Sequence, residues 1–229
     1  MSESPFILFG QQHLIALALS ALIIICFPLY AKNHLSKDHQ ETTAKILAFF
    51  LIAHELSKPF YRTYFFGDEP VKVIPLHACH LSAFSIAIYL FTRKKVFFEV
   101  AYYWGLAGGT MALLTPDLVF SFPDVEWFPF FTGHGVMIMA IFFSMFCHNI
   151  FPTKHSYRRV VLITLSLLPM IFIINTLLGP PANYWYLNTK PEGDSLMSYM
   201  PSPPFHIPIA MGIALGIFYL LHIPFRKKS

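Results

Sequence analysis

Seven long apolar segments constrain the fold of this chain more than any other feature of its sequence. Each is close to the roughly 20 residues that a helix needs to cross the hydrocarbon core of a bilayer. They lie at approximately 13–30, 44–60, 73–91, 97–115, 130–150, 160–178 and 205–225. The pattern predicts an all-α fold, a polytopic membrane protein in which residues 1–229 form a single bundle of seven transmembrane helices.

The low charge content agrees with this fold class. Only 12% of the 229 residues are charged, whereas soluble domains contain about a quarter. The basic residues lie between apolar runs rather than in one patch, which argues against a nucleic-acid partner. Glu3 and no Lys or Arg precede the first apolar segment, so a cleaved secretory signal is not expected. We expect a multi-pass protein of the cell membrane, with the lipid bilayer as its environment and no signal for its oligomeric state.

The distribution of charge between loops predicts the orientation. One set of loops, with the C-terminus, carries Lys32, Lys37, Arg93, Lys94, Lys95, Lys154, Arg158, Arg159, Arg226, Lys227 and Lys228. The alternate loops carry only Arg62, Lys72 and Lys190. The positive-inside rule then places the N-terminus outside and the C-terminus in the cytoplasm. That arrangement requires an odd number of spans, as seven is.

Polar and reactive side chains collect at the predicted outer ends of the apolar segments. They are His13, Glu55, His77, Cys79, His80, Asp117, His134, Asn175, Asn183, Tyr184 and His206. Intramembrane ionisable residues are candidates for a functional site. The alternative is that helix ends are simply wetter than helix middles, and both interpretations stay open on these residues alone.

Cys79 is the sharpest single candidate. Pro75 suits the first turn of a helix, which places Cys79 about one turn inside it, where the helix dipole lowers a thiol pKa and favours the thiolate. The alternative is a small buried apolar residue, which is what we expect of Cys26 and Cys147. Three cysteines without CxxC spacing indicate neither a disulfide framework nor a zinc finger.

A cysteine nucleophile needs a base nearby. His77 is two residues from Cys79, about 200° round a helix, and therefore points elsewhere. His134, between Gly133 and Gly135, has the same predicted depth and is a better partner. The alternative for His134 is a histidine at a helix start, bonded to a carbonyl.

Other pairs have simpler interpretations. His77 and His80 share a helix face at i, i+3, so a two-histidine metal site stays possible, although the spacing of the wider cluster argues against metal. Glu55 and Lys58 are predicted to form an ion pair that lowers the cost of burying each other. Gly105 and Gly109 form a GxxxG pattern, which indicates close helix packing. We expect no metal and no cofactor.

Four short stretches carry a resemblance to a known family. They are 75–79 (PLHAC), 115–117 (TPD), 130–134 (FFTGH) and 179–187 (GPPANYWYL). In this order they resemble the YwaF-like integral membrane family, whose members resemble the animal transmembrane protein 164, a phospholipid acyltransferase. The resemblance covers most of the chain. It implies acyl transfer by a Cys and a His, which correspond by motif to Cys79 and His134.

The function expected from the residues and the resemblance together is lipid acyl transfer at the extracytoplasmic leaflet, with a phospholipid or lysophospholipid as substrate. Cys79 and His134 are the predicted catalytic residues. The predicted substrate-binding residues are His77, Asn175, Asn183, Tyr184, Asp117 and Glu55. Two alternatives remain: a transporter or proton-coupled carrier, and a non-catalytic membrane scaffold.

Overall fold

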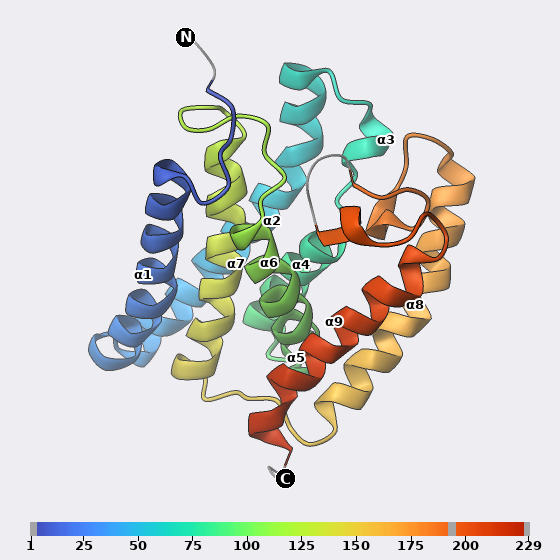
Figure 1. Cartoon of the computed structure of the whole chain (residues 1–229). Coiled ribbons are helices and arrows are strands. Elements are labelled where there is room, and N and C mark those ends of the chain that lie inside the picture. Colours follow the sequence, from blue (N-terminus) through green and yellow to red (C-terminus); the bar gives the residue numbers. More distant parts are fainter. Residues whose placement is uncertain (1–3, 192–195, 227–229) are drawn as a thin grey trace. The chain divides into compact units, whose positions relative to one another are not determined.

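The computed structural model describes residues 4–191 and 196–226, and helices dominate this part of the chain (Figure 1). The α-helices are α1 (Gln11–His34), α2 (Lys37–Phe66), α3 (Pro70–Val73), α4 (Ala78–Thr92), α5 (Lys95–Trp104), α6 (Thr110–Leu114), α7 (Trp127–Cys147), α8 (Ser156–Leu178) and α9 (His206–His222). A π-helical turn, η1 (Gly105–Gly109), joins α5 to α6, and the 3-10 turns are η2 (Tyr184–Tyr186), η3 (Leu196–Tyr199) and η4 (Ile223–Phe225). The prediction of an all-helical protein is confirmed.

Several helices have the length and composition of membrane spans. Among the described residues these are α1, α7, α8 and the segment His206–Phe225, and α4 is a shorter apolar helix. Most of α1 and α8 is exposed, with large apolar side chains such as Leu22, Phe172 and Leu177 on the surface. Such faces suit a lipid environment. The chain is therefore a membrane protein with several apolar helices, and the count of seven spans stays a prediction.

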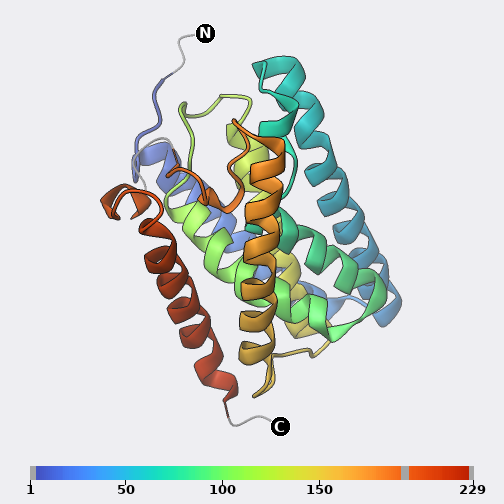
Figure 2. The same cartoon turned by 90° about the vertical axis from the view of Figure 1, so that its right-hand side faces the viewer.

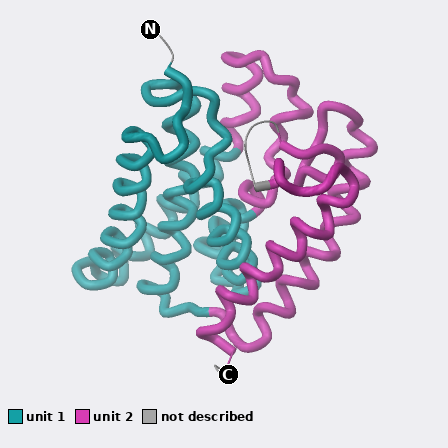
Figure 3. Tube along the Cα trace, in the orientation of Figure 1, with its two compact units in different colours: residues 1–55, 82–151 teal, residues 56–81, 152–229 magenta. Residues whose placement is uncertain are grey.

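The chain divides into two compact units, coloured separately in Figure 3. Unit 1 comprises Met1–Glu55 and Ser82–Phe151, and unit 2 comprises Leu56–Leu81 and Pro152–Ser229. The boundaries fall inside α2 and inside α4, so each of these helices contributes to both units. A single domain over the whole chain stays a prediction.

In unit 1, α1 and α7 lie side by side and run in the same direction (Figure 1). Near their first turns the rings of His13 and Phe131 are 5.9 Å apart, and near their last turns those of Phe27 and Phe143 are 6.4 Å apart. The first and fifth predicted spans of an alternating topology should be parallel in this way.

The unit 1 part of α2 runs antiparallel to α7. Its first residue, Lys37, donates from Nζ to the Cys147 carbonyl at the end of α7, while His54 contacts the Pro129 carbonyl near the start of α7. Direction therefore alternates between these helices, as the predicted topology requires.

The π turn between α5 and α6 packs tightly against its neighbours. A Cβ atom added to Gly105 would lie 2.6 Å from Ser82 Oγ and 2.7 Å from Ile141 Cδ1, and one added to Gly109 would lie 2.6 Å from Met137 Cε. A larger residue at either position would require these side chains to move. The prediction that the GxxxG pattern marks close helix packing is confirmed.

Unit 2 contains the antiparallel pair α8 and α9, which Figure 2 shows running in opposite directions. Tyr157 at the start of α8 stacks on His222 at the end of α9, with ring centroids 5.6 Å apart. The other end of this pair carries a small core of Ile171, Ala182, Tyr184 and Leu187. That core fixes the segment after α8, which holds several of the predicted site residues.

Candidate functional site

Cys79 is the second residue of α4, in its first turn. The prediction that Pro75 lies inside this first turn is wrong, because the helix begins only at Ala78. The Leu76 amide donates to the Ile74 carbonyl (2.8 Å), which closes a tight turn, and the His77 carbonyl accepts the first helical bond from Leu81 (3.1 Å). The thiol is partly exposed and forms no disulfide. In the first turn of α4 it lies at the positive end of the helix dipole.

The other two cysteines differ from Cys79 and from each other. Cys147 is buried, with its Sγ 4.0 Å from the Pro28 carbonyl, as the sequence predicts. Cys26 is exposed on α1, so the prediction that it is a buried apolar residue is wrong. It lies beside Ile23 and Ile25 on a surface of exposed apolar side chains, a place where a thiol is tolerated without internal packing.

Two hydrogen bonds connect the segment that precedes α4 to the η2 segment, which follows α8. Trp185 Nε1 donates to the Leu76 carbonyl (3.0 Å), and the Tyr184 hydroxyl donates to the Val71 carbonyl. Burial raises the pKa of Tyr184, so its hydroxyl stays a donor near neutral pH. These two bonds position the segment that leads into α4, the helix that carries Cys79.

The η2 backbone itself is strained. Trp185 and Tyr186 have φ values of 59° and 52°, in the left-handed region that side chains of this size rarely adopt. Asn175, which is 1% exposed, offsets that strain with two bonds to the Tyr184 backbone, one from Nδ2 to the carbonyl (2.9 Å) and one from the amide to Oδ1 (2.8 Å). The contacts described for Asn175 are therefore structural.

An aromatic and imidazole cluster surrounds His77. Its ring centroid is 5.8 Å from that of His80, 5.5 Å from Tyr184 and 5.1 Å from Tyr186. His206 Nε2 donates to the Tyr186 carbonyl (2.7 Å) from the start of α9. His77 precedes α4, so the helical angle that was expected to turn it away from Cys79 does not apply.

Asn183 faces its own loop. Its Nδ2 donates to the Thr189 carbonyl (2.9 Å), and its Oδ1 accepts from the amides of Asn188 (3.0 Å) and Thr189 (3.2 Å). The substrate-binding roles predicted for His77, Asn175, Asn183 and Tyr184 thus stay predictions, while the structure does gather His77, Asn175 and Tyr184 at one end of unit 2.

In unit 1, His134 lies about two turns into α7 rather than at its start, because the helix begins at Trp127. The expected bond to a carbonyl is present: Nδ1 is 2.8 Å from the Phe130 carbonyl. A carbonyl only accepts, so Nδ1 carries the hydrogen and the neutral ring has its lone pair on Nε2. That tautomer presents Nε2 as the proton acceptor.

Two residues of α2 lie near the same end of α7. His54 Nε2 is 3.0 Å from the Pro129 carbonyl, and His54 Nδ1 is 3.3 Å from Oε1 of Glu55, which is 3% exposed. The predicted pairing of Glu55 with Lys58 stays a prediction. Asp117 is exposed in the loop that follows α6. Its predicted contact with substrate also stays a prediction.

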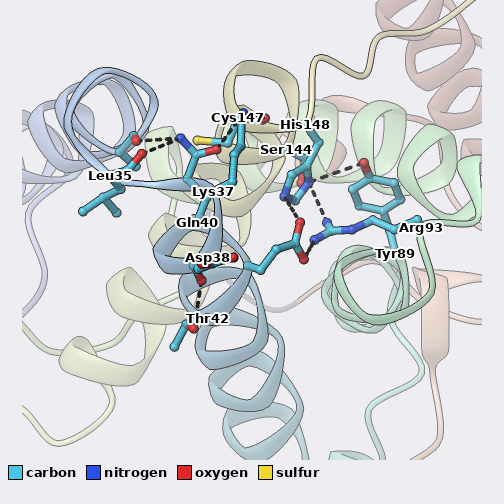
Figure 4. Close-up of polar contacts among 12 residues, drawn as sticks. Leu35, Lys37, Asp38, Gln40, Thr42, Tyr89, Arg93, Ser144, Cys147 and His148 are labelled. Carbon is cyan, nitrogen blue, oxygen red and sulfur yellow. Dashed lines mark hydrogen bonds and ion pairs between the residues drawn. The ribbon is translucent and has the colours of Figure 1, made fainter.

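A second polar cluster lies at the opposite ends of these helices, where α2 starts and α7 ends (Figure 4). Arg93 donates from one guanidinium nitrogen to His148 Nδ1 (2.6 Å) and from another to Glu41. The Tyr89 hydroxyl is 3.5 Å from the same imidazole nitrogen. Burial, and next the Arg93 guanidinium, lower the pKa of His148 from 6.5 to about 4. In the sequence Arg93 is only a topology signal, and nothing there links it to His148 or Glu41, which are 55 and 52 positions away.

Side chains near the start of α2 satisfy helix ends beside this cluster (Figure 4). Gln40 Nε2 donates to the carbonyls of Ala31 (3.0 Å) and Leu35 (3.1 Å), and Lys37 donates to that of Cys147 (3.4 Å). Carbonyls at helix C-termini lack partners within their own helix, so these bonds stabilise the ends of α1 and α7.

Cys79 belongs to unit 2 and His134 to unit 1, so their pairing is a matter for proposal. Within residues 4–191 and 196–226, no three side chains of His, Cys, Asp or Glu are grouped as a metal site would require.

Comparisons with known proteins place this geometry in context. A model of the TMEM164 family matches residues 8–222, a range that contains every candidate residue described above. An uncharacterized protein of Treponema pallidum (strain Nichols) is 25% identical over 228 residues, which cover 98% of this chain and 92% of that protein. No solved structure matches the chain significantly.

Proposed function

The chain belongs to the TMEM164 family, and from that premise we propose that it is a membrane-embedded lipid acyltransferase that forms a thioester on Cys79. The observation that carries the proposal is the position of Cys79 in the first turn of α4, partly exposed and preceded by an ordered turn. A thiol there gains thiolate character from the helix dipole. The resemblance of the sequence motifs to a phospholipid acyltransferase gives the substrate class.

The reaction has two steps. In the first, His134 Nε2 takes the Cys79 proton, the sulfur attacks the acyl carbonyl of a phospholipid ester, the C–S bond forms and the C–O bond breaks. The leaving alkoxide takes the proton from the His134 imidazolium. In the second, an acceptor hydroxyl gives its proton to His134 and attacks the thioester, and the Cys79 thiolate leaves. With water as the acceptor, the same steps give hydrolysis.

We further propose seven spans with an outer N-terminus, so that the site lies at the extracytoplasmic leaflet. The opposing directions of α2 and α7 in unit 1 and the excess of Lys and Arg at one end support this orientation. Acyl-CoA is cytoplasmic, so an outer site draws its acyl chain from a phospholipid. A cysteine introduced at Val119 should label from outside intact cells and one at Lys94 should not; equal labelling rejects the orientation.

The direct test of the acyltransferase is the acyl-enzyme itself. Purified protein incubated with radiolabelled phosphatidylcholine should acquire a hydroxylamine-sensitive acyl group, and Cys79→Ser should lose it together with turnover. Cys26→Ser is the matched control because that thiol is exposed on the apolar surface of α1. Wild-type turnover in Cys79→Ser, with unchanged size-exclusion behaviour in detergent, rejects the covalent mechanism.

A proton-coupled carrier is the second candidate. The observation that favours it is Glu99, a carboxyl group on α5 with 0% exposure, since buried acids in membrane helices commonly serve proton transfer. Proteoliposomes carrying a pH-sensitive dye would distinguish the two: a carrier dissipates a proton gradient and loses that activity in Glu99→Gln, whereas the acyltransferase leaves the gradient intact.

A further inference from the structure

His54 lies directly against the turn of α7 that precedes His134. A Cβ atom added to Gly133 would lie 2.3 Å from Cε1 of the His54 ring and 2.9 Å from its Nε2. A side chain at this position would require the His54 ring to move. Gly135, on the other side of His134, has only Ser20 Oγ within 4 Å of an added Cβ, at 3.9 Å, which is an ordinary contact. Gly133 is therefore in close contact with a neighbouring side chain, whereas Gly135 is not.

Hydrogen bonding fixes the His54 ring in this place. Its Nε2 donates to the Pro129 carbonyl (3.0 Å), which lies one turn before Gly133 on α7. Its Nδ1 is bonded to Glu55 Oε1 (3.3 Å), and the side chains of His54 and Glu55 are 9% and 4% exposed. The ring of Phe50 stacks on it from one turn earlier in α2, with centroids 5.8 Å apart.

We infer that His54 and Glu55 are positioning residues for His134, and that the absence of a side chain at Gly133 leaves room for the His54 ring. The ring and its bond to Pro129 fix the rotation and depth of the α7 turn from which His134 projects, and Glu55 fixes the ring. This inference rests on the role proposed for His134 as the base that takes the Cys79 proton. A displacement of about 1 Å at a reacting group is enough to lower turnover by about 100-fold.

The test compares matched variants by two measurements. The first is nitrogen NMR of histidine-labelled protein in detergent, with the His134 signals assigned by their loss in His134→Gln. Wild-type protein should show the Nδ1-protonated tautomer, and these signals should shift in Gly133→Ala and His54→Ala but not in Gly135→Ala. The second is kcat and KM for acyl transfer.

For turnover we expect kcat to fall at least about tenfold in Gly133→Ala and His54→Ala, with KM within about twofold, because geometry at the base changes and lipid binding does not. His54→Gln should retain more activity than His54→Ala, since its amide N–H reaches the Pro129 carbonyl as Nε2 does. Glu55→Gln should lie between wild type and His54→Ala. Gly135→Ala should stay within about twofold of wild type.

The outcomes separate the two proposals. Unchanged His134 signals in a folded His54→Ala protein overturn the positioning role, as do equal effects of Gly133→Ala and Gly135→Ala. If Gly133→Ala does not fold, the comparison of His54→Gln with His54→Ala carries the test, and equal loss in both rejects it. Shifted His134 signals in the variants of a protein that never forms an acyl-enzyme leave the positioning intact and reject the acyltransferase.

Discussion

Two histidines lie towards opposite ends of α7, His134 about two turns after its start and His148 just after its last residue, and their rings are held as opposite tautomers. His134 donates from Nδ1 to a carbonyl of its own helix, which leaves the lone pair on Nε2. His148 accepts a hydrogen bond from Arg93 at Nδ1, so its hydrogen is on Nε2, 4.0 Å from Glu41. Both residues are partly buried, so burial does not distinguish a chemical role from a structural one. The partner of Nδ1 does, because it decides which nitrogen can accept a proton.

The charge around the two ends differs as well. At the His148 end an arginine lies against the ring, and a second positive charge there is unfavourable. At the His134 end the nearby side chains include His54 and the Glu55 carboxyl group, and a carboxylate favours a positive charge near it. The proposed base must become positively charged during the reaction, which the Arg93 guanidinium opposes at His148.

The largest expected difference is in turnover. His134→Gln should lower kcat for acyl transfer by about 100-fold or more, because a positioned general base contributes about 10²–10⁴. His148→Gln should stay within about threefold of wild type, because its ring supports no step of the reaction. Acyl-transfer kinetics of both variants in the same detergent would measure this, and a loss in His148→Gln as large as in His134→Gln would remove the contrast.

Stability should show the reverse order, with a smaller effect. His148→Ala leaves a nitrogen of Arg93 without its acceptor and should cost about 1–3 kcal/mol. His134→Ala removes a hydrogen bond to a carbonyl of the same helix and should cost about 1 kcal/mol. Denaturant unfolding monitored by Trp fluorescence would compare them, and greater destabilisation by His134→Ala contradicts the assignment.

The dependence of stability on pH should identify His148. Its pKa is about 4 in the folded protein against 6.5 for the unfolded chain, so between these values the unfolded chain binds a proton that the folded chain does not. Stability therefore falls as the pH drops from about 6.5 to about 4, and the effect is absent above 6.5. His148→Gln should flatten this slope in melting curves recorded across the range, and an unchanged slope rejects His148 as its source.

The smallest expected effect is at the rim of the Arg93 cluster. The Glu41 side chain is 54% exposed and that of Arg93 33% exposed, and ion pairs in such positions contribute less than about 1 kcal/mol. Glu41→Gln should destabilise the protein by no more than that, and less in high salt. A cost comparable to that of His148→Ala would show that the carboxylate, rather than the imidazole, holds this end together.

The presence of the long helices could be predicted because each has its own apolar run. The positions of the helix ends depend on contacts with adjacent segments. Each of the seven predicted segments overlaps a helix or a run of consecutive helices. The start of α4 was placed too early because Pro75 is the central residue of a tight turn, Ile74–Leu76, that precedes the helix. The start of α7 was placed too late because Trp127 and Phe128, read as a loop, already belong to the helix.

Candidate site residues were predictable as types but not as partners. His134 could be predicted as a candidate between Gly133 and Gly135, yet nothing in the sequence indicates that a ring 79 positions away lies against only one of these glycines. His54 was therefore absent from the predicted site residues. Contacts of this range depend on how helices pack, which periodicity and local motifs do not encode.

The π turn at Gly105–Gly109 also sets the rotational phase of α6. A π turn holds about one residue more than an α turn, and each residue of an α-helix advances the chain by about 100°, so the same residues wound as a regular α-helix would rotate α6 by about that angle. Leu113, 5% exposed in the present arrangement, would leave its stripe, and its carbonyl would shift from His13 Nε2, now 2.8 Å away. Such a regular helix would be equally apolar by hydropathy, yet it would turn a different face toward α7.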